Sequence, residues 1–264
     1  MEARVLEHDH TGEGDPPFVL LPGGLAGWDG WLPLVPALSR SRRVVRVQLI
    51  ANAEGVAGRI GDPAYDTYLE RESLRMTLDA LGVEEMHLVG WSNGGRTALD
   101  FALAFPDRIR TLTAIEPPAW WLVDDADARA VSEFIAGCAG RECDEEDVRR
   151  FLIGVGVAGP DADFSALPQW DLWVSCRQTL SWYGNRALRS AEAGLDGFER
   201  LAVPTLLIRG TVSAPWLRAV VDVLAEGLPD AKVVELAGGH ASMLQSPEAF
   251  LASLEEHVGS QRTG

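Results

Sequence analysis

Basic residues are scarce in this sequence, and a long apolar run is missing from it. Lys232 is the single lysine, and 23 lysines and arginines stand against 39 aspartates and glutamates, which gives a net charge of −16. Such a balance disfavours nucleic-acid backbones and anionic membranes as partners. No apolar stretch reaches the roughly 18 residues that a membrane-spanning helix needs. We therefore expect no nucleic-acid partner and no membrane partner.

Cysteines are few as well, and their spacing carries no motif. Cys138, Cys143 and Cys176 are odd in number and form no C-x-x-C, so neither a disulfide framework nor a zinc site is implied. The run 8–10 (His-Asp-His) offers a pair of metal ligands without an evident third. We expect no metal and no cofactor. Because the first residues are polar and no N-x-S/T acceptor occurs, we also expect a cytoplasmic protein without a signal peptide.

Short apolar runs alternate with helical patterns along most of the chain. An edge strand is predicted at Arg4–His8, and the other runs, typical of buried parallel strands, lie at Phe18–Leu21, Val44–Ile50, Met86–Val89, Thr111–Ile115, Thr205–Ile208 and Val233–Leu236. Helical patterns fall at about 31–39, 67–81, 95–105, 214–227 and 247–258. This alternation predicts an α/β class protein with a mostly parallel, doubly wound sheet, whose ligands bind beyond the carboxyl ends of the strands.

Residues 117–200 interrupt the alternation, because they contain no run of the buried-strand type. We expect helices here, inserted after the strand that ends near Ile115, as a lid over a core made of residues 1–116 and 201–264. The acidic run 144–147 favours a helix start. The segment holds five of the nine tryptophans. These rings either form the lid's own core or line an apolar pocket. The substrate-binding candidates in the segment are Trp120, Trp121, Trp182 and Tyr183.

The most informative motif is Gly90-Trp91-Ser92-Asn93-Gly94, a G-x-S-x-G between a predicted strand and a predicted helix. In that context a serine sits on a strained turn, and glycines allow the backbone to approach it closely. A serine hydroxyl needs a neighbouring base to act as a nucleophile. His240 is the best candidate, since it follows the last predicted strand and its loop can reach Ser92.

A carboxylate should orient the histidine, and here the sequence departs from the commonest pattern. After the strand that ends at Ile208, Ser213 stands where an aspartate is usual. Glu116 is the predicted substitute, because it follows the neighbouring strand directly and precedes two prolines, an awkward place for an unpaired charge. The alternatives are a glutamate that merely begins a surface loop, and an acid supplied by Asp29, Asp62 or Asp222.

A glycine-rich loop at 21–27 follows the second predicted strand. Acyl transfer requires donors for the developing oxyanion, and we expect the backbone amides of Asn93 and of Gly24 or Leu25 to supply them. Leu25 in this loop and Trp28 just after it are further substrate-binding candidates. The loop could instead cradle a phosphate, but it matches neither G-x-G-x-x-G nor a P-loop with its lysine.

These features together resemble the α/β-hydrolase fold, and within it the chain is similar to zearalenone-type lactone hydrolases. The stretch from Phe105 through Glu116 and Pro118 carries the likeness, and its glutamate lies 24 positions after the serine, as in that family. The resemblance implies an α/β-hydrolase fold, a triad of Ser92, His240 and Glu116, and oxyanion amides of Gly24 and Asn93. It also implies that Trp182 stands beside the substrate.

The sequence therefore predicts a serine hydrolase that cleaves a small apolar ester or lactone through an acyl-enzyme. A binding protein of the same fold with little turnover is one alternative, favoured by the missing acid at Ser213. A biosynthetic enzyme that uses the same residues for elimination or C–C cleavage is another. Whether the chain forms a homodimer stays open.

Overall fold

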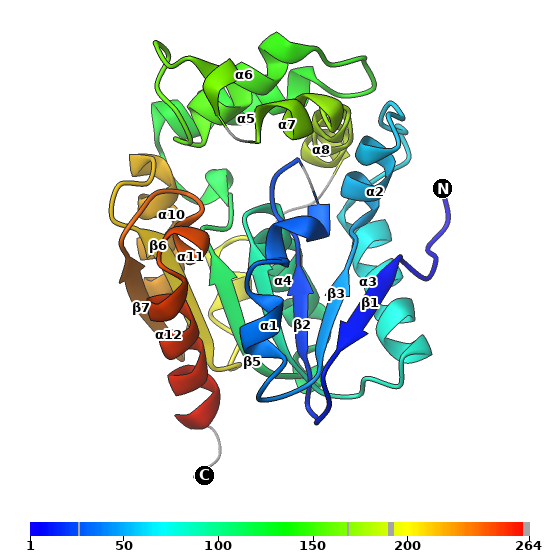
Figure 1. The fold of residues 1–264 in the computed structure, drawn as a ribbon, viewed down its shortest axis with the longest axis vertical. Coiled ribbons are helices and arrows are strands. Elements are labelled where there is room, and N and C mark those ends of the chain that lie inside the picture. The colour runs from blue at the N-terminus through cyan, green and yellow to red at the C-terminus, as the bar shows by residue number, and fades with distance from the viewer. Residues whose placement is uncertain (26, 168, 190–192, 261–264) are drawn as a thin grey trace.

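A seven-stranded sheet forms the centre of the protein (Figure 1). The computed structural model describes the chain except residues 26, 168, 190–192 and 261–264. The strand order is β1-β3-β2-β4-β5-β6-β7, and all neighbours are parallel except β1 and β3. The strands are β1 (His8–Thr11), β2 (Phe18–Leu21), β3 (Val44–Val47), β4 (Met86–Trp91), β5 (Ile109–Ile115), β6 (Thr205–Gly210) and β7 (Ala231–Leu236).

Helices cover both faces of this sheet and its carboxyl end (Figure 1). The α-helices are α1 (Val35–Leu38), α2 (Ile50–Val56), α3 (Thr67–Ala80), α4 (Asn93–Ala104), α5 (Ala126–Gly137), α6 (Glu145–Gly154), α7 (Trp170–Ser175), α8 (Thr179–Arg189), α9 (Leu195–Phe198), α10 (Pro215–Gly227), α11 (Ser242–Gln245) and α12 (Pro247–Gly259). Short 3₁₀ helices lie at η1 (Gly27–Trp31), η2 (Pro106–Arg108), η3 (Trp120–Leu122) and η4 (Phe164–Ala166). Among the described residues, none of these helices is long and apolar enough to cross a membrane.

The central strands are apolar along their whole length because helices bury both of their faces. All residues of β2 and β3 are buried, as are nearly all of β4 and β5. Helices α3, α4 and α10 share one apolar core with the sheet, and α1, α11 and α12 share a second core on the opposite face. The predicted doubly wound, mostly parallel sheet is confirmed, and its buried strands follow the continuous apolar runs.

Two of the predicted strand boundaries are wrong. The edge strand β1 begins at His8, where the predicted strand ends, and it pairs with β3 from His8 opposite Val47. Strand β3 ends at Val47, and the following apolar residues from Ile50 form helix α2 instead. The carboxylate of Glu70 accepts a hydrogen bond from the Ile50 amide, so a residue of α3 caps this helix.

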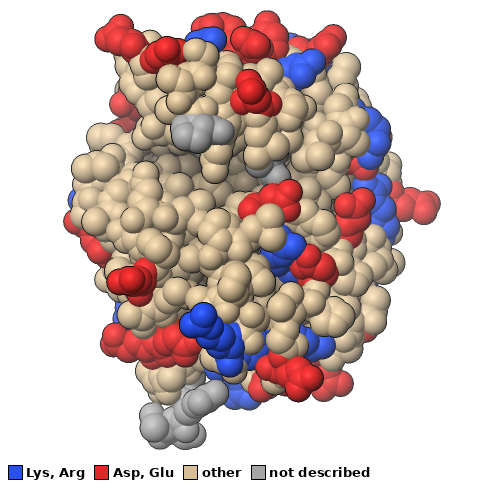
Figure 2. Space-filling view, viewed as in Figure 1, with Lys and Arg blue, Asp and Glu red and all other residues tan. Residues whose placement is uncertain are grey.

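The segment between β5 and β6 contains helices and no strand among its described residues, as predicted. Its helices α5 to α8 gather above the carboxyl ends of the strands, in the upper part of Figure 1. Figure 2 shows many acidic side chains on this upper part and again at the lower end, with a broad uncharged area between them on the left of the view. The negative charge of the chain is thus not collected in one patch on this face.

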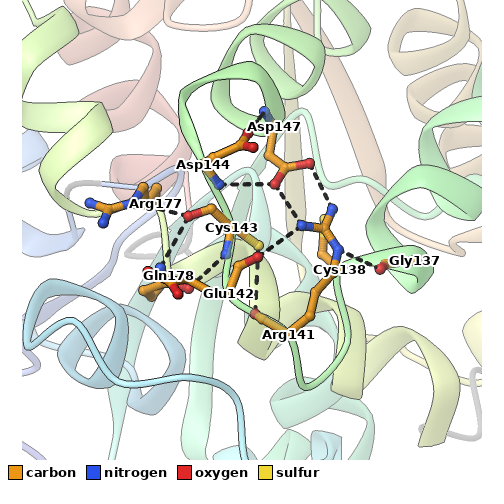
Figure 3. A network of polar contacts seen from close by, with 9 residues as sticks. All are labelled: Gly137, Cys138, Arg141, Glu142, Cys143, Asp144, Asp147, Arg177 and Gln178. Atoms are coloured by element: carbon orange, nitrogen blue, oxygen red, sulfur yellow. Dashed lines mark hydrogen bonds and ion pairs between the residues drawn. The ribbon is translucent and has the colours of Figure 1, made fainter.

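A polar network ties the turn between α5 and α6 to the start of α8 (Figure 3). Asp144 and Asp147 form a capping box at the start of α6, so the predicted helix start in the acidic run is confirmed. Both carboxylate oxygens of Asp147 accept from Arg141 at 2.7 Å. Gln178 Oε1 accepts a hydrogen bond from the Cys143 amide at 3.0 Å, and Gln178 Nε2 donates one to the Cys143 carbonyl oxygen at 3.1 Å. These polar bonds add to the apolar packing that joins the inserted helices.

Helices α5 and α8 pack so closely at Gly184 that a methyl group there would lie 2.4 Å from the Ala139 amide nitrogen. We expect Gly184→Ala to lower the free energy of unfolding by about 1–3 kcal/mol, the usual cost of overpacking. Gly137 in α5 is the matched control, since an added methyl would meet nothing within 4 Å among the described residues. Urea unfolding of both variants checks this, and equal midpoints would contradict it.

Candidate active site

The turn at Ser92 joins β4 to α4 and places the serine at the carboxyl end of the sheet. Ser92 has a φ of 51° and a ψ of −120°, a strained combination for a residue with a side chain. The glycines on either side are required by close approach. A Cβ atom at Gly90 would lie 2.3 Å from the Gly94 carbonyl oxygen, and one at Gly94 would lie 2.4 Å from the Leu21 carbonyl oxygen. The motif therefore folds as the nucleophile elbow that its sequence predicts.

The structure brings Ser92, His240 and Glu116 together in a single hydrogen-bonded line. His240 Nε2 lies 2.9 Å from Ser92 Oγ, and His240 Nδ1 lies 2.7 Å from Glu116 Oε2. All three side chains are buried. This arrangement can move a proton from the serine hydroxyl to the imidazole while a carboxylate stabilises the imidazolium.

The neighbouring strand β5 positions Glu116, which immediately follows it. Its amide nitrogen donates to the Ile208 carbonyl oxygen of β6, and its Oε1 accepts from the Gly210 amide at 2.7 Å. Although burial alone would raise it, the pKa of Glu116 is lowered because His240 and the Gly210 amide donate to the carboxylate. The side chain of Ser213, at the position of the usual acid, also helps to lower this pKa. Glu116 therefore stays ionised where an orienting anion is needed.

Trp91, the second residue of the elbow motif, holds the loop that carries His240. Its indole Nε1 donates to the His240 carbonyl oxygen at 2.8 Å, and the two rings lie 5.9 Å apart between centroids. On the far side of the loop, the Gly239 amide donates to Gln245 Oε1 at 2.7 Å. The histidine is thus fixed from both β4 and α11, which limits the positions that its ring can take.

The glycine-rich loop after β2 lies directly against the elbow. A Cβ atom at Gly23 would lie 2.9 Å from Ser92 Cβ. The next residue, Gly24, has a φ of 63°, and its carbonyl oxygen accepts from Asn52 Nδ2 and from the Tyr183 hydroxyl, both at 2.8 Å. These two hydrogen bonds fix the loop through the Gly24 carbonyl group. The amides of Asn93, Gly94 and Gly95 precede the first hydrogen bond of α4, which the Arg96 amide donates to the Ser92 carbonyl oxygen.

A pocket opens at Ser92 between the sheet and the inserted helices. One wall is apolar and comes mainly from the inserted helices α5 and α6 and from α10. Polar side chains of α4 and α8 form the other wall. The lining residues are Ser92, Asn93, Arg96, Pro118, Trp120, Val131, Ile135, Phe151, Val155, Tyr183, Arg186 and Trp216. A small organic molecule bound here would lie against the serine.

Comparison with known proteins identifies the family. A family model described as the α/β hydrolase fold matches residues 16–136. A protein of Azorhizobium caulinodans that is named as a carbamate hydrolase, RutD, is 30% identical over 93% of this chain and 91% of its own length. The chain belongs to the α/β-hydrolase family.

A further relative agrees with this assignment, and a solved structure shares the fold. A pimeloyl-[acyl-carrier protein] methyl ester esterase of Aeromonas hydrophila is 26% identical over 95% of this chain and 98% of its own length. The crystal structure of a hydrolase from Pseudomonas aeruginosa superposes with a TM-score of 0.73 over 96% of this chain and 93% of its own, at 24% identity. The second likeness concerns the fold alone.

Of the predicted substrate-binding side chains in this α/β hydrolase, Trp120 and Tyr183 line the pocket. The structure places the other four elsewhere. Trp182 donates to the Arg59 carbonyl oxygen at 2.8 Å and stacks edge-on against Tyr65. Leu25 lies in the apolar core, Arg46 covers the ring of Trp28, and Trp121 donates to the Ala193 carbonyl oxygen. The resemblance to zearalenone-type enzymes put Trp182 beside the substrate, whereas here its ring fills the contact between α8 and the core.

Two buried arginines of the pocket, Arg96 and Arg186, were not predicted from the sequence. Arg96 lies four residues beyond Ser92, on a helix whose other buried residues are uncharged. A charge on such a helix is a signal that could have been noticed. Burial and the neighbouring Arg186 guanidinium hold the pKa of Arg96 well below its usual range. No comparable pattern marks Arg186, since only the fold brings α8 to the pocket.

Proposed function

We propose that this protein is a serine hydrolase that cleaves a small carboxylic ester or lactone through an acyl-enzyme. The hydrogen-bonded line from Ser92 to Glu116, with its distances of 2.9 and 2.7 Å inside a pocket, is the observation that carries the proposal. The names of the two relatives, a carbamate hydrolase and a methyl ester esterase, agree with hydrolysis of an acyl derivative. The lactone part rests on the resemblance to zearalenone-type enzymes.

In the first half of the reaction, Ser92 Oγ attacks the carbonyl carbon while His240 Nε2 takes the hydroxyl proton. Glu116 stabilises the imidazolium that forms. The carbonyl oxygen becomes an oxyanion, and the amides of Asn93 and Gly24 donate to it. When the tetrahedral intermediate collapses, His240 returns the proton to the leaving alkoxide, which departs as an alcohol and leaves an acyl-serine.

In the second half, His240 takes a proton from a water molecule, whose oxygen attacks the acyl carbon. Collapse of the second tetrahedral intermediate releases the carboxylic acid and restores the Ser92 hydroxyl. Residues 117–200 act as a lid in this proposal, since their helices supply most of the apolar pocket wall. An enclosed, apolar wall keeps bulk water from the reacting atoms and strengthens the electrostatic interactions there.

The experiment that tests this proposal is covalent labelling with a fluorophosphonate probe, which reacts with activated serines. We expect labelling of one residue, and peptide mapping by mass spectrometry should locate the phosphonyl group on Ser92. Preincubation with a p-nitrophenyl ester should slow the labelling. An unlabelled protein, or a label on a different serine, would instead favour a binding protein with the hydrolase fold.

A further inference from the structure

The guanidinium of Arg186 is fully buried beside the nucleophile, and this placement calls for a reason. Its side chain has 0% exposure and reaches from α8 into the lining of the pocket that holds Ser92. Removing an arginine from water costs several kcal/mol unless charges or hydrogen bonds compensate. An arginine at such a position is therefore expected to have an anionic partner.

Among the described residues, Arg186 has only neutral oxygens as hydrogen-bond acceptors. Its Nη1 donates to Thr97 Oγ1 at 2.8 Å and to Asn93 Oδ1 at 3.3 Å, and its Nε donates to Thr67 Oγ1 at 3.3 Å. Its Nη2 is buried and has no hydrogen-bond partner among the described residues. The guanidinium is thus oriented by three bonds and keeps one donor group for another molecule.

The buried carboxylates near Arg186 are engaged elsewhere or lie at longer range. Glu70 accepts hydrogen bonds from the Ile50 amide at 2.7 Å and from the Tyr65 hydroxyl, so each of its two oxygens already has a donor other than Arg186. Burial raises the pKa of both Glu70 and Asp100 in spite of the attraction of Arg186. Long-range attraction of this kind leaves the Nη2 hydrogen-bond donors without an acceptor.

The position of Arg186 relative to the serine is fixed by Asn93, the residue after Ser92. Because Arg186 Nη1 donates to the Asn93 side chain, an anion held by Nη2 lies at a constant distance from the nucleophile. Most of the remaining pocket wall is apolar and suits a hydrocarbon chain. Arg96 lines the same pocket and adds positive charge to it. A planar guanidinium matches the geometry of a carboxylate well.

We propose that Arg186 binds a free carboxylate of the substrate, so that the hydrolase acts on an ester or lactone that also carries a carboxylate. A half-ester of an aliphatic dicarboxylic acid is the simplest such molecule. The apolar wall contacts its hydrocarbon chain, Arg186 holds the ionised end, and Ser92 meets the ester carbonyl group. This substrate class replaces the wholly apolar ester that the sequence suggests, and it rests on the hydrolase function proposed above.

The experiment compares monomethyl adipate with its terminal amide, which has the same length and no charge. We expect kcat/KM of the wild-type enzyme to be at least about 10-fold higher for the acid, since a hydrogen bond to a charged group contributes about 1.5–3 kcal/mol. In Arg186→Gln this ratio should fall to about one, and in Arg186→Lys it should lie between the two values. Arg149→Gln, which removes an arginine stacked on Trp170, is the control that should keep the wild-type ratio.

A measurement on the wild-type protein keeps the proposal testable if Arg186→Gln fails to fold. Adipate should inhibit hydrolysis of p-nitrophenyl butyrate competitively, and adipamide at the same concentration should not. Equal kcat/KM for acid and amide, or equal inhibition by adipate and adipamide, would overturn the carboxylate site. If p-nitrophenyl butyrate is still hydrolysed in that case, the hydrolase function stands and only the carboxylate site is wrong.

Discussion

Ser92→Ala is expected to abolish hydrolysis of p-nitrophenyl butyrate, with a loss of about 10⁶-fold in kcat, the size found when a triad nucleophile is removed. The reason is that no other oxygen takes the place of Ser92 Oγ, which lies 2.9 Å from the base His240. Turnover should fall to the level that a preformed oxyanion site and substrate binding alone can sustain. Initial rates above the buffer rate measure this loss.

The substitution should leave the fold intact, which separates a chemical effect from a structural one. Alanine keeps the Cβ atom, so the backbone strain at φ 51° is unchanged. Removal of the hydroxyl group breaks only its hydrogen bond to His240. We expect a change of about 1 kcal/mol or less in the free energy of unfolding. Ser253→Ala removes an exposed hydroxyl from α12 and serves as the matched control with full activity. Retention of a tenth of the wild-type rate in Ser92→Ala would refute the assignment of the nucleophile.

Glu116→Gln is expected to lower kcat by about 10⁴-fold, as when the aspartate of a serine-protease triad becomes an amide. Glutamine has the same shape, but it carries no charge to stabilise the imidazolium, and its amide group allows the wrong histidine tautomer. The bond to the Gly210 amide can persist through the remaining carbonyl oxygen. Steady-state hydrolysis of p-nitrophenyl butyrate measures the effect, and a loss of less than 10-fold would contradict the role of Glu116.

A second substitution tests whether the acid can be moved to its commoner position. Ser213 lies next to Gly210, and its side chain contributes to the low pKa of Glu116. In the Glu116→Gln background, Ser213→Asp should therefore restore kcat about 10- to 100-fold, since a carboxylate again faces the imidazole. The single substitution Glu235→Gln removes an exposed carboxylate from the neighbouring strand β7. It is the control for a general charge effect and should keep the wild-type rate. Failure of Ser213→Asp to raise kcat would show that position 213 cannot orient His240.

The sequence by itself determined the sheet, the elbow and the three residues of the line through His240. These features depend on the local sequence. A strand that helices bury on both faces has a continuous apolar run, and the turn at Ser92 requires glycine at positions 90 and 94. Glu116 could also be predicted, since a charge directly after a buried strand is unfavourable without a partner. The parallel arrangement then brings the ends of β4 and β5 to the same edge of the sheet.

Only the tertiary structure decided what surrounds these residues. Helix α2 begins at Ile50, where Glu70, 20 positions away, caps it. Trp182 lies outside the pocket and packs edge-on against Tyr65. The orientation of Arg186 depends on Asn93 and Thr97, which lie 93 and 89 positions away along the chain. Contacts over such separations depend on how whole helices pack, and no local pattern encodes them. For this reason the sequence predicts an apolar pocket, while the fold places a buried cation beside the serine.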